Sequence, residues 1–272
     1  MDCRHLRLAK CIFYRWYPRR CLGFFSVAAR AGAAQNRSPN TVENEKTSFK
    51  ETIVFLLQRQ AFWQIALGCS TASFVGYGNG NFFPSLLIRN YGLTVTEIGM
   101  FMGVISGSTG MLRTFLGGYL ADRWGKHDKR WYVRIALWGL ALSLPLSYYT
   151  LLGSEPLYVV LAYTPAHILN TLYLGPCIAI CHTLVAPNMR ASASAVLLFV
   201  INMIGLGLGP LVVGALSDAY IPPFGEENLR YAMLTALTMG TSGVFFFWMA
   251  HRTLLADISK TDAALTGTTA TS

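Results

Sequence analysis

The sequence predicts an all-α membrane protein with six transmembrane helices. Only 13% of the 272 residues are charged and 53% are hydrophobic, whereas an average soluble protein has roughly a quarter of its residues charged. Six apolar segments of about the length of a bilayer-spanning helix follow one another along the chain. Because these stretches offer too little charge to face water, we expect lipid to surround most of the protein.

Residues 1–50 come before the apolar segments and form a basic tail or linker. They hold ten Lys and Arg against three Asp and Glu, so they carry most of the net charge of +9. We expect this tail to be disordered and to lie at the anionic cytoplasmic surface of the membrane. An organellar transit peptide and a gene-boundary artefact are the alternatives. Nucleic-acid binding is not expected, because no zinc-ligand spacing or aromatic-interleaved domain follows the basic residues.

The transmembrane domain is predicted over residues 51–252. Because the loops between its apolar segments are short, consecutive helices must be antiparallel. Residues 253–272, which end in TGTTATS, are expected to form a disordered cytoplasmic tail. The six predicted spans cover residues 61–88, 98–121, 132–152, 157–184, 193–216 and 231–250.

The charges of the loops predict the orientation. The loop DRWGKHDKRWYVR after the second span is rich in Lys and Arg, and the loop near APNMR after the fourth span carries Arg190. The positive-inside rule therefore places these loops and both termini in the cytoplasm. The expected location is the inner (plasma) membrane of a bacterium.

A short sequence pattern that occurs twice predicts an internal repeat. The second span ends in Gly118-Tyr-Leu-Ala-Asp122 and the fifth ends in Gly214-Ala-Leu-Ser-Asp218. These spans are three helices apart, so the two copies run in opposite directions. The pattern is typical of two three-helix units related by inverted topology.

The string GGYLADRWGKHDKR is the most specific motif in the chain. Asp122 stands at a helix exit, where its charge would favour the positive amino-terminus of a neighbouring helix. Arg123, Lys126 and Arg130 would hold the loop at the anionic membrane surface, and Gly125 would supply the turn. An ordinary basic loop would explain the Lys and Arg residues but not the whole pattern.

This string resembles the loop of the major facilitator superfamily that joins the second and third helices of each half. The strings YGNGNFFPSLLIRNYGLTVTEIG and APNMRASASAVLLFVINMIGLGLGPLVVGALSD resemble the spinster-like branch of that family. The resemblance covers roughly residues 50–250 and corresponds to helices 7 to 12. It implies that the chain is one half of the fold, with two inverted three-helix repeats, and that a separate first half or a second copy of this chain completes it.

The resemblance also implies roles for several residues. In the family, the loop aspartate of one half docks on a helix of the other half, so Asp122 and Arg190 would lack partners within this chain. Gly209 and Pro210 resemble the glycine-proline element that shapes gating helices. Glycines at three- or four-residue intervals along the second span predict a face where another helix backbone packs closely.

Arg113 is the leading candidate for binding a solute. It lies nine positions before Asp122, which is about 13 Å into the membrane at 1.5 Å per residue. A charge at that depth costs at least ~2.5 kcal/mol, so it should face the bundle interior or a watery cavity. We predict that Arg113 binds an anionic group of the solute; the alternative is a structural partner on another helix.

Other polar residues are weaker candidates for the cavity wall. The segment GYGNGNFFP is expected to interrupt the first span and to turn carbonyl groups toward a cavity. For all of these residues, hydrogen bonding between helices is the alternative role. The candidates are Tyr77, Asn79, Asn81, His167, Asn170 and Asn202.

These features predict a secondary active transporter, or its C-terminal half, working by alternating access on a small or amphipathic solute. Arg113 suggests an anionic group on the solute, and the resemblance suggests a lipid-like solute, such as a lysophospholipid or sphingoid compound. The sequence holds no G-x-x-x-x-G-K phosphate-binding loop, so an ion gradient, with a proton as candidate co-substrate, or the solute's own gradient would supply the energy.

Two other functions compete with this one. A truncated membrane protein could fail to transport until it assembles with a separate first half. A membrane-embedded enzyme is less favoured, because the sequence has no G-x-S-x-G and no H-E-x-x-H motif. No cofactor and no metal is expected, since the cysteines form no CxxC pair.

Overall fold

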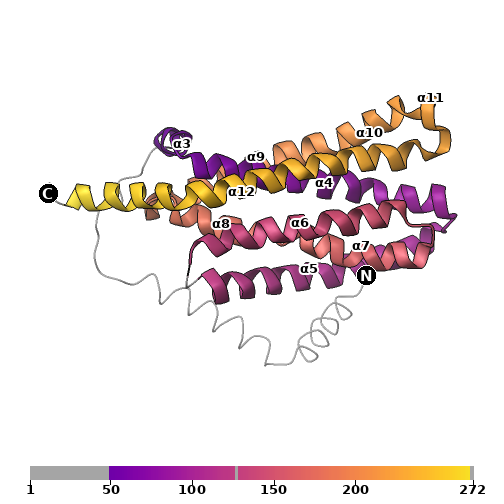
Figure 1. Ribbon diagram of the computed structural model, residues 1–272, viewed down its shortest axis with the longest axis horizontal. Coiled ribbons are helices and arrows are strands. Elements are labelled where there is room, and N and C mark those ends of the chain that lie inside the picture. The colour runs from indigo at the N-terminus through magenta and orange to yellow at the C-terminus, as the bar shows by residue number, and fades with distance from the viewer. Residues whose placement is uncertain (1–48, 126–127, 270–272) are drawn as a thin grey trace, which may run out of the picture. The chain divides into compact units, whose positions relative to one another are not determined.

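A computed structural model describes residues 49–125 and 128–269, and the elements in these ranges are helices (Figure 1). Short 3₁₀ turns at Pro187–Met189 and Gly225–Glu227 and a π-helix at Met203–Leu208 lie between the α-helices. The α-helices are α3 (Phe49–Leu57), α4 (Gln60–Tyr91), α5 (Val95–Gly125), α6 (Arg130–Leu152), α7 (Pro156–Thr171), α8 (Leu174–Thr183), α9 (Arg190–Asn202), α10 (Gly209–Ala219), α11 (Ile221–Phe224) and α12 (Asn228–Thr269).

The prediction of an all-α membrane protein is confirmed. Within the described residues, five helical segments are long and apolar enough to cross a bilayer, and each coincides with a predicted span. The predicted first span corresponds to α4, which is 32 residues long but is not one of the five. Its centre carries Tyr77, Asn79 and Asn81, which lower its mean hydropathy.

Helix α4 runs without a break through GYGNGNFFP, so the predicted interruption of the first span is wrong. Pro84 lies inside the helix and removes only the hydrogen bond to the carbonyl of Gly80. The bonds on either side keep the helix intact. The polar side chains of this segment therefore project from a regular helix.

The fourth predicted span is the one that breaks. It is divided into α7 and α8 at Leu172 and Tyr173. Pro176 follows four residues after Leu172, where its ring would collide with the Leu172 carbonyl of a continuous helix. The α-helical hydrogen bonding is interrupted at Leu172 and Tyr173, although both keep right-handed helical backbone angles.

The fifth span contains a π-helical segment, Met203–Leu208, between α9 and α10. Gly205 in this segment and Gly209 at the start of α10 face α4 at close range. A Cβ on Gly209 would lie 2.9 Å from the carbonyl oxygen of Phe74 and 3.1 Å from the amide nitrogen of Gly78. Gly209 therefore lets the backbones of two helices touch, and Pro210 begins the following α-helix at its first turn.

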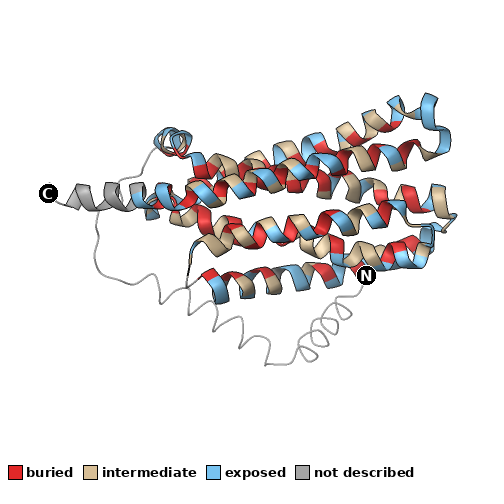
Figure 2. Cartoon of the chain, viewed as in Figure 1, coloured by how far each residue is buried: buried red, intermediate tan, exposed pale blue. Residues whose placement is uncertain are grey.

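Helix α12 packs most extensively against α4 and α6 and continues to Thr269. Over residues 253–269 the structure has helix where a disordered tail was predicted, and residues 270–272 lie outside the described residues. Leu254 and Ile258 extend the buried face of Phe247 and Ala250 at helical spacing, and all four are buried (Figure 2 shows the buried positions in red). The sequence becomes less hydrophobic after Arg252, but its apolar residues keep the helical spacing that buries one face.

The end of this buried face is tied to the start of α4. Asp257 is buried, and its carboxylate accepts a hydrogen bond from the amide of Ala61 at 2.9 Å. Arg59 donates to the backbone carbonyl of Asp257 at 3.4 Å. An anionic side chain from α12 thus caps the positive amino-terminus of α4.

We expect the substitution Asp257→Ala to lower the free energy of unfolding by about 1–2 kcal/mol, because the buried Ala61 amide would lose its acceptor. Thermal melting of the purified chain in detergent measures this. The control is Glu226→Ala, at an exposed position in the turn before α12. Equal melting temperatures for the two variants would contradict the capping role.

Candidate functional site

A cavity of about 730 Å³ lies among α4, α5, α7 and α8. Four of the predicted solute-binding residues line it together: Tyr77 from α4, Arg113 from α5, and His167 and Asn170 from α7. Their positions span nearly a hundred residues of sequence, so the packing of the helices brings them to one place. The remaining polar residues of the wall are Ser73, Ser106, Thr109, Thr171 and Tyr173.

The charge of this cavity is positive. Arg113 is exposed on its wall and lies near enough to His167 for the two groups to interact electrostatically. Among the described residues, no Asp or Glu lines the cavity. A guanidinium group without a facing carboxylate suits an anionic ligand.

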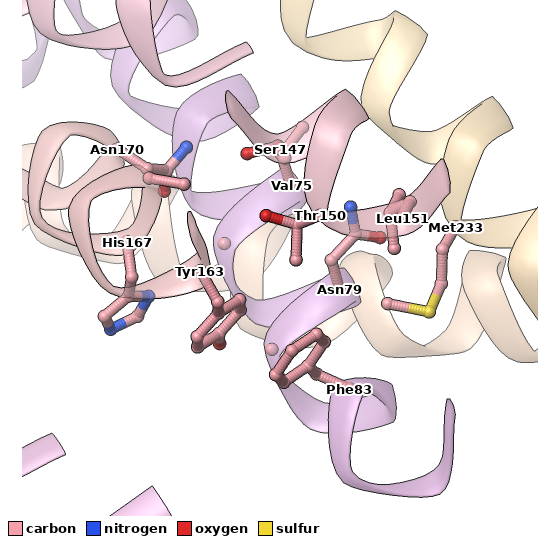
Figure 3. A pocket seen from close by; sticks show the side chains of 13 residues that line it. Val75, Asn79, Phe83, Ser147, Thr150, Leu151, Tyr163, His167, Asn170 and Met233 are labelled. Atoms are coloured by element: carbon pink, nitrogen blue, oxygen red, sulfur yellow. The ribbon is translucent and has the colours of Figure 1, made fainter. Parts of the chain in front are cut away.

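A second, smaller chamber of about 40 Å³ shares Gly76, His167 and Asn170 with the large cavity. Figure 3 shows its labelled side chains, which come from α4, α6, α7 and α12. The amide oxygens of Asn79 and Asn170 are buried here and accept no hydrogen bond from the part of the chain that the structure describes. The chamber is large enough for a water molecule or a small polar group of a ligand.

Aromatic rings support the side of this chamber. Tyr163 stacks on Phe83 with ring centroids 3.9 Å apart and on His167 with centroids 5.6 Å apart. The stack joins α4 to α7 and holds the imidazole between the two cavities. His167 is therefore positioned by packing rather than by a hydrogen bond that the structure records.

Two predicted residues are not brought to the site, so their assignment to the cavity wall was wrong for this structure. Asn81 is exposed and lies about 200° around the helix from Asn79, on another face. Asn202 is exposed at the end of α9 and donates to the carbonyl of Leu198 on its own helix at 2.8 Å. Neither lines either cavity.

Some cavity residues were missed. Ser106 and Thr109 lie seven and four positions before Arg113, so helical spacing alone could have placed them on its face. Tyr173 lies in the break between α7 and α8, and its hydroxyl is 2.8 Å from that of Ser73. The dipeptide Gly175-Pro176 was the available signal for that break.

The loop motif is more helical than expected. Helix α5 continues to Gly125, where the backbone packs against the ring of Tyr132. Arg123 donates to the hydroxyl of Tyr119 at 3.3 Å, one turn earlier in the same helix. Gly118 lines the large cavity, which links the motif to the site.

Other members of the motif remain predictions. Arg130 begins α6, and its amide donates to the carboxylate of Asp128 at 2.9 Å. Arg190 is exposed at the start of α9. The side chain of Asp122 and the whole of Lys126 lie outside the described residues, so their docking role is untested.

The fold and the cavity define a class: polytopic α-helical membrane proteins with a cavity between their helices. Residues 21–210 match the family model of the Major Facilitator Superfamily. The chain belongs to this family. Membership of this family favours a transporter over a membrane-embedded enzyme.

The chain is similar to several members of the family. It is 33% identical over 204 residues to an MFS-type efflux pump of Mycolicibacterium smegmatis, covering 75% of this chain and 47% of the pump. It is 25% identical over 258 residues to Protein spinster homolog 3 of Danio rerio, covering 88% of this chain and 51% of that protein. The chain therefore spans about half the length of these relatives.

The solved structures agree on the fold. A bacterial homolog to the human lysosomal transporter Spinster, in its inward-facing and unoccupied conformation, superposes with a TM-score of 0.72. The match has 24% identity and covers 82% of this chain and 53% of that one. The chain thus has the fold of one half of a spinster-like transporter, as its sequence predicts.

Proposed function

We propose that this chain is the solute-binding half of a secondary transporter that moves an anionic, amphipathic solute by alternating access. One observation supports this most: Arg113, Tyr77, His167 and Asn170 surround a single cavity in which no described residue supplies a carboxylate. A fixed positive charge in a low-dielectric surrounding favours a negatively charged headgroup.

The size and lining of the cavity favour a lipid-like solute. Its volume of about 730 Å³ lies within the range of roughly 300–1,000 Å³ for small-molecule sites. Leu172, Leu174 and Ile178 add apolar surface beside the polar wall. A lysophospholipid or a phosphorylated sphingoid compound combines the charge and the chain that such a site would hold.

A further six-helix unit would complete the transporter. Helix α5 is largely exposed, and a second six-helix unit against it would enclose the cavity. We propose a separate first half as this unit, with a second copy of the chain as the alternative. A co-transported proton would need a carrier, and we expect the partner to supply its carboxylate.

Flux into vesicles tests the assembly. The chain is reconstituted with the first half of the mycobacterial relative, and uptake of fluorescent lysophosphatidylglycerol is followed. We expect flux only when both polypeptides are present, and much less with a monoacylglycerol of the same chain length, which lacks the phosphate.

Each other outcome has a defined meaning. Flux from the chain alone would show that copies of it assemble into a transporter. Absence of flux in both preparations, with both polypeptides folded and inserted, would favour a non-transporting membrane partner. Equal flux of the two lipids would contradict the anionic solute.

A further inference from the structure

A cluster of cationic and aromatic residues lies away from the cavity, where the start of α6 meets α12. We name it the Arg-Trp cluster; its members are Arg130, Trp131, Arg134, Trp248, His251 and Arg252. The guanidinium of Arg134 lies 5.1 Å from the ring centroid of Trp131, and that of Arg252 lies 3.8 Å from that of Trp248. These cation–π contacts hold two positive charges at the edge of the bundle.

The cluster is short of negative charge. Nη2 of Arg134 donates a hydrogen bond to Nε2 of His251 at 3.5 Å, so an imidazole rather than a carboxylate is its recorded partner. Nε of Arg130 and Nδ1 of His251 are buried and have no hydrogen-bond partner among the described residues. The one carboxylate that acts on His251, Asp128, accepts the backbone amide of Arg130.

Among the described residues, no ion pair is recorded for a member of the Arg-Trp cluster; the recorded pair, Arg230 with Glu227, lies at the other end of α12. Buried donors without acceptors are costly, and so is the mutual repulsion of neighbouring cations. A bound anion with several oxygen acceptors would relieve both.

An exposed apolar surface continues from the cluster along both helices. Trp138 lies one turn beyond Arg134 on α6, and Phe245 lies two turns before Arg252 on α12. These side chains are 59% and 54% exposed, and Trp248 is 42% exposed. None of these residues lines either cavity, and this exposed apolar face is suited to contact with lipid.

We propose that the Arg-Trp cluster binds the phosphate of an anionic phospholipid, whose acyl chains lie along Trp138 and Phe245. Guanidinium groups bind phosphate oxygens through paired hydrogen bonds, and tryptophan favours the depth of the lipid headgroups. Basic pockets between transmembrane helices bind such headgroups on the cytoplasmic side, which is where the positive-inside rule places the start of α6. This lipid is distinct from the transported solute.

The purified chain tests the proposal without any variant. Its melting temperature is measured in neutral detergent with phosphatidylglycerol, with phosphatidylcholine of the same acyl chains, or with inorganic phosphate, and native mass spectrometry counts the lipids retained. We expect phosphatidylglycerol alone to raise the melting temperature and to be retained. Equal effects of the two lipids, or an equal effect of inorganic phosphate, would overturn the lipid site.

Variants then locate the site. Arg130→Gln and Arg134→Gln should each weaken retention of phosphatidylglycerol by about fivefold, the size expected for one basic residue at an anionic headgroup. Arg89→Gln, an exposed arginine near the far end of α4, should leave retention unchanged. Retention equal to the unsubstituted chain in both cluster variants would place the lipid elsewhere and refute the assignment.

Discussion

Replacing Arg113 with alanine is expected to weaken binding of an anionic amphiphile by about 10- to 100-fold. A hydrogen-bonded charge contributes about 1.5–3 kcal/mol, and within the described residues no other arginine or lysine lines the cavity to replace it. Titration of lysophosphatidylglycerol into the assembled two-part transporter, followed by tryptophan fluorescence, gives the affinity. A monoacylglycerol of the same length should bind the variant and the unsubstituted protein equally.

The substitution Arg113→Lys separates charge from geometry. Lysine keeps the positive charge but loses the planar fork, so we expect an affinity between those of the alanine variant and the unsubstituted protein. Arg89→Ala, at the exposed end of α4, serves as the matched control. Unchanged affinity in both Arg113 variants would mean that this residue has a structural partner instead of a ligand.

Replacing Gly209 with alanine is expected to lower the free energy of unfolding by about 1–3 kcal/mol. The new Cβ would lie 2.9 Å from the Phe74 carbonyl oxygen and 3.1 Å from the Gly78 amide nitrogen. Both are backbone atoms, so no side-chain rotation can relieve the contact and α10 would have to move away from α4. Thermal melting in detergent measures the loss.

A neighbouring glycine supplies the control for this prediction. Gly207 lies in the π-helical segment, and the nearest atom to a Cβ built there is 3.9 Å away. Gly207→Ala should therefore melt close to the unsubstituted chain. If the two alanine variants melt together, the close approach of α10 to α4 does not limit stability.

The spans were predictable from the sequence because hydrocarbon imposes one simple condition, a long apolar helix. The local helix geometry inside the spans was not predictable, because it depends on how each helix packs against neighbouring helices. Pro84 and Pro176 have the same chemistry, yet α4 stays continuous, whereas the helix is interrupted between α7 and α8. Hydropathy also ended the last span too early, since burial of Leu254 and Ile258 depends on the packing of α12 against the rest of the bundle.

The candidate site was predictable in part because the hydrocarbon also restricts where a charged side chain can lie. The depth of Arg113 required a polar surrounding, and its face of α5 does meet Tyr77, His167 and Asn170 at one cavity. Asparagine gives a weaker signal, because its side chain can line a cavity, bond to a neighbouring helix or bond to its own backbone. Asn79 and Asn202 illustrate the first and the last of these, and sequence alone cannot separate them.

The π-helical segment has a further consequence for the fifth span. A π turn winds more residues into each revolution than an α turn, so the side-chain stripes of α9 and α10 do not line up across it. If Met203–Leu208 became α-helical, α10 would rotate about its own axis relative to α9. Such a rotation would move Gly209 off the α4 backbone, so the contact between α10 and α4 depends on this segment staying π-helical.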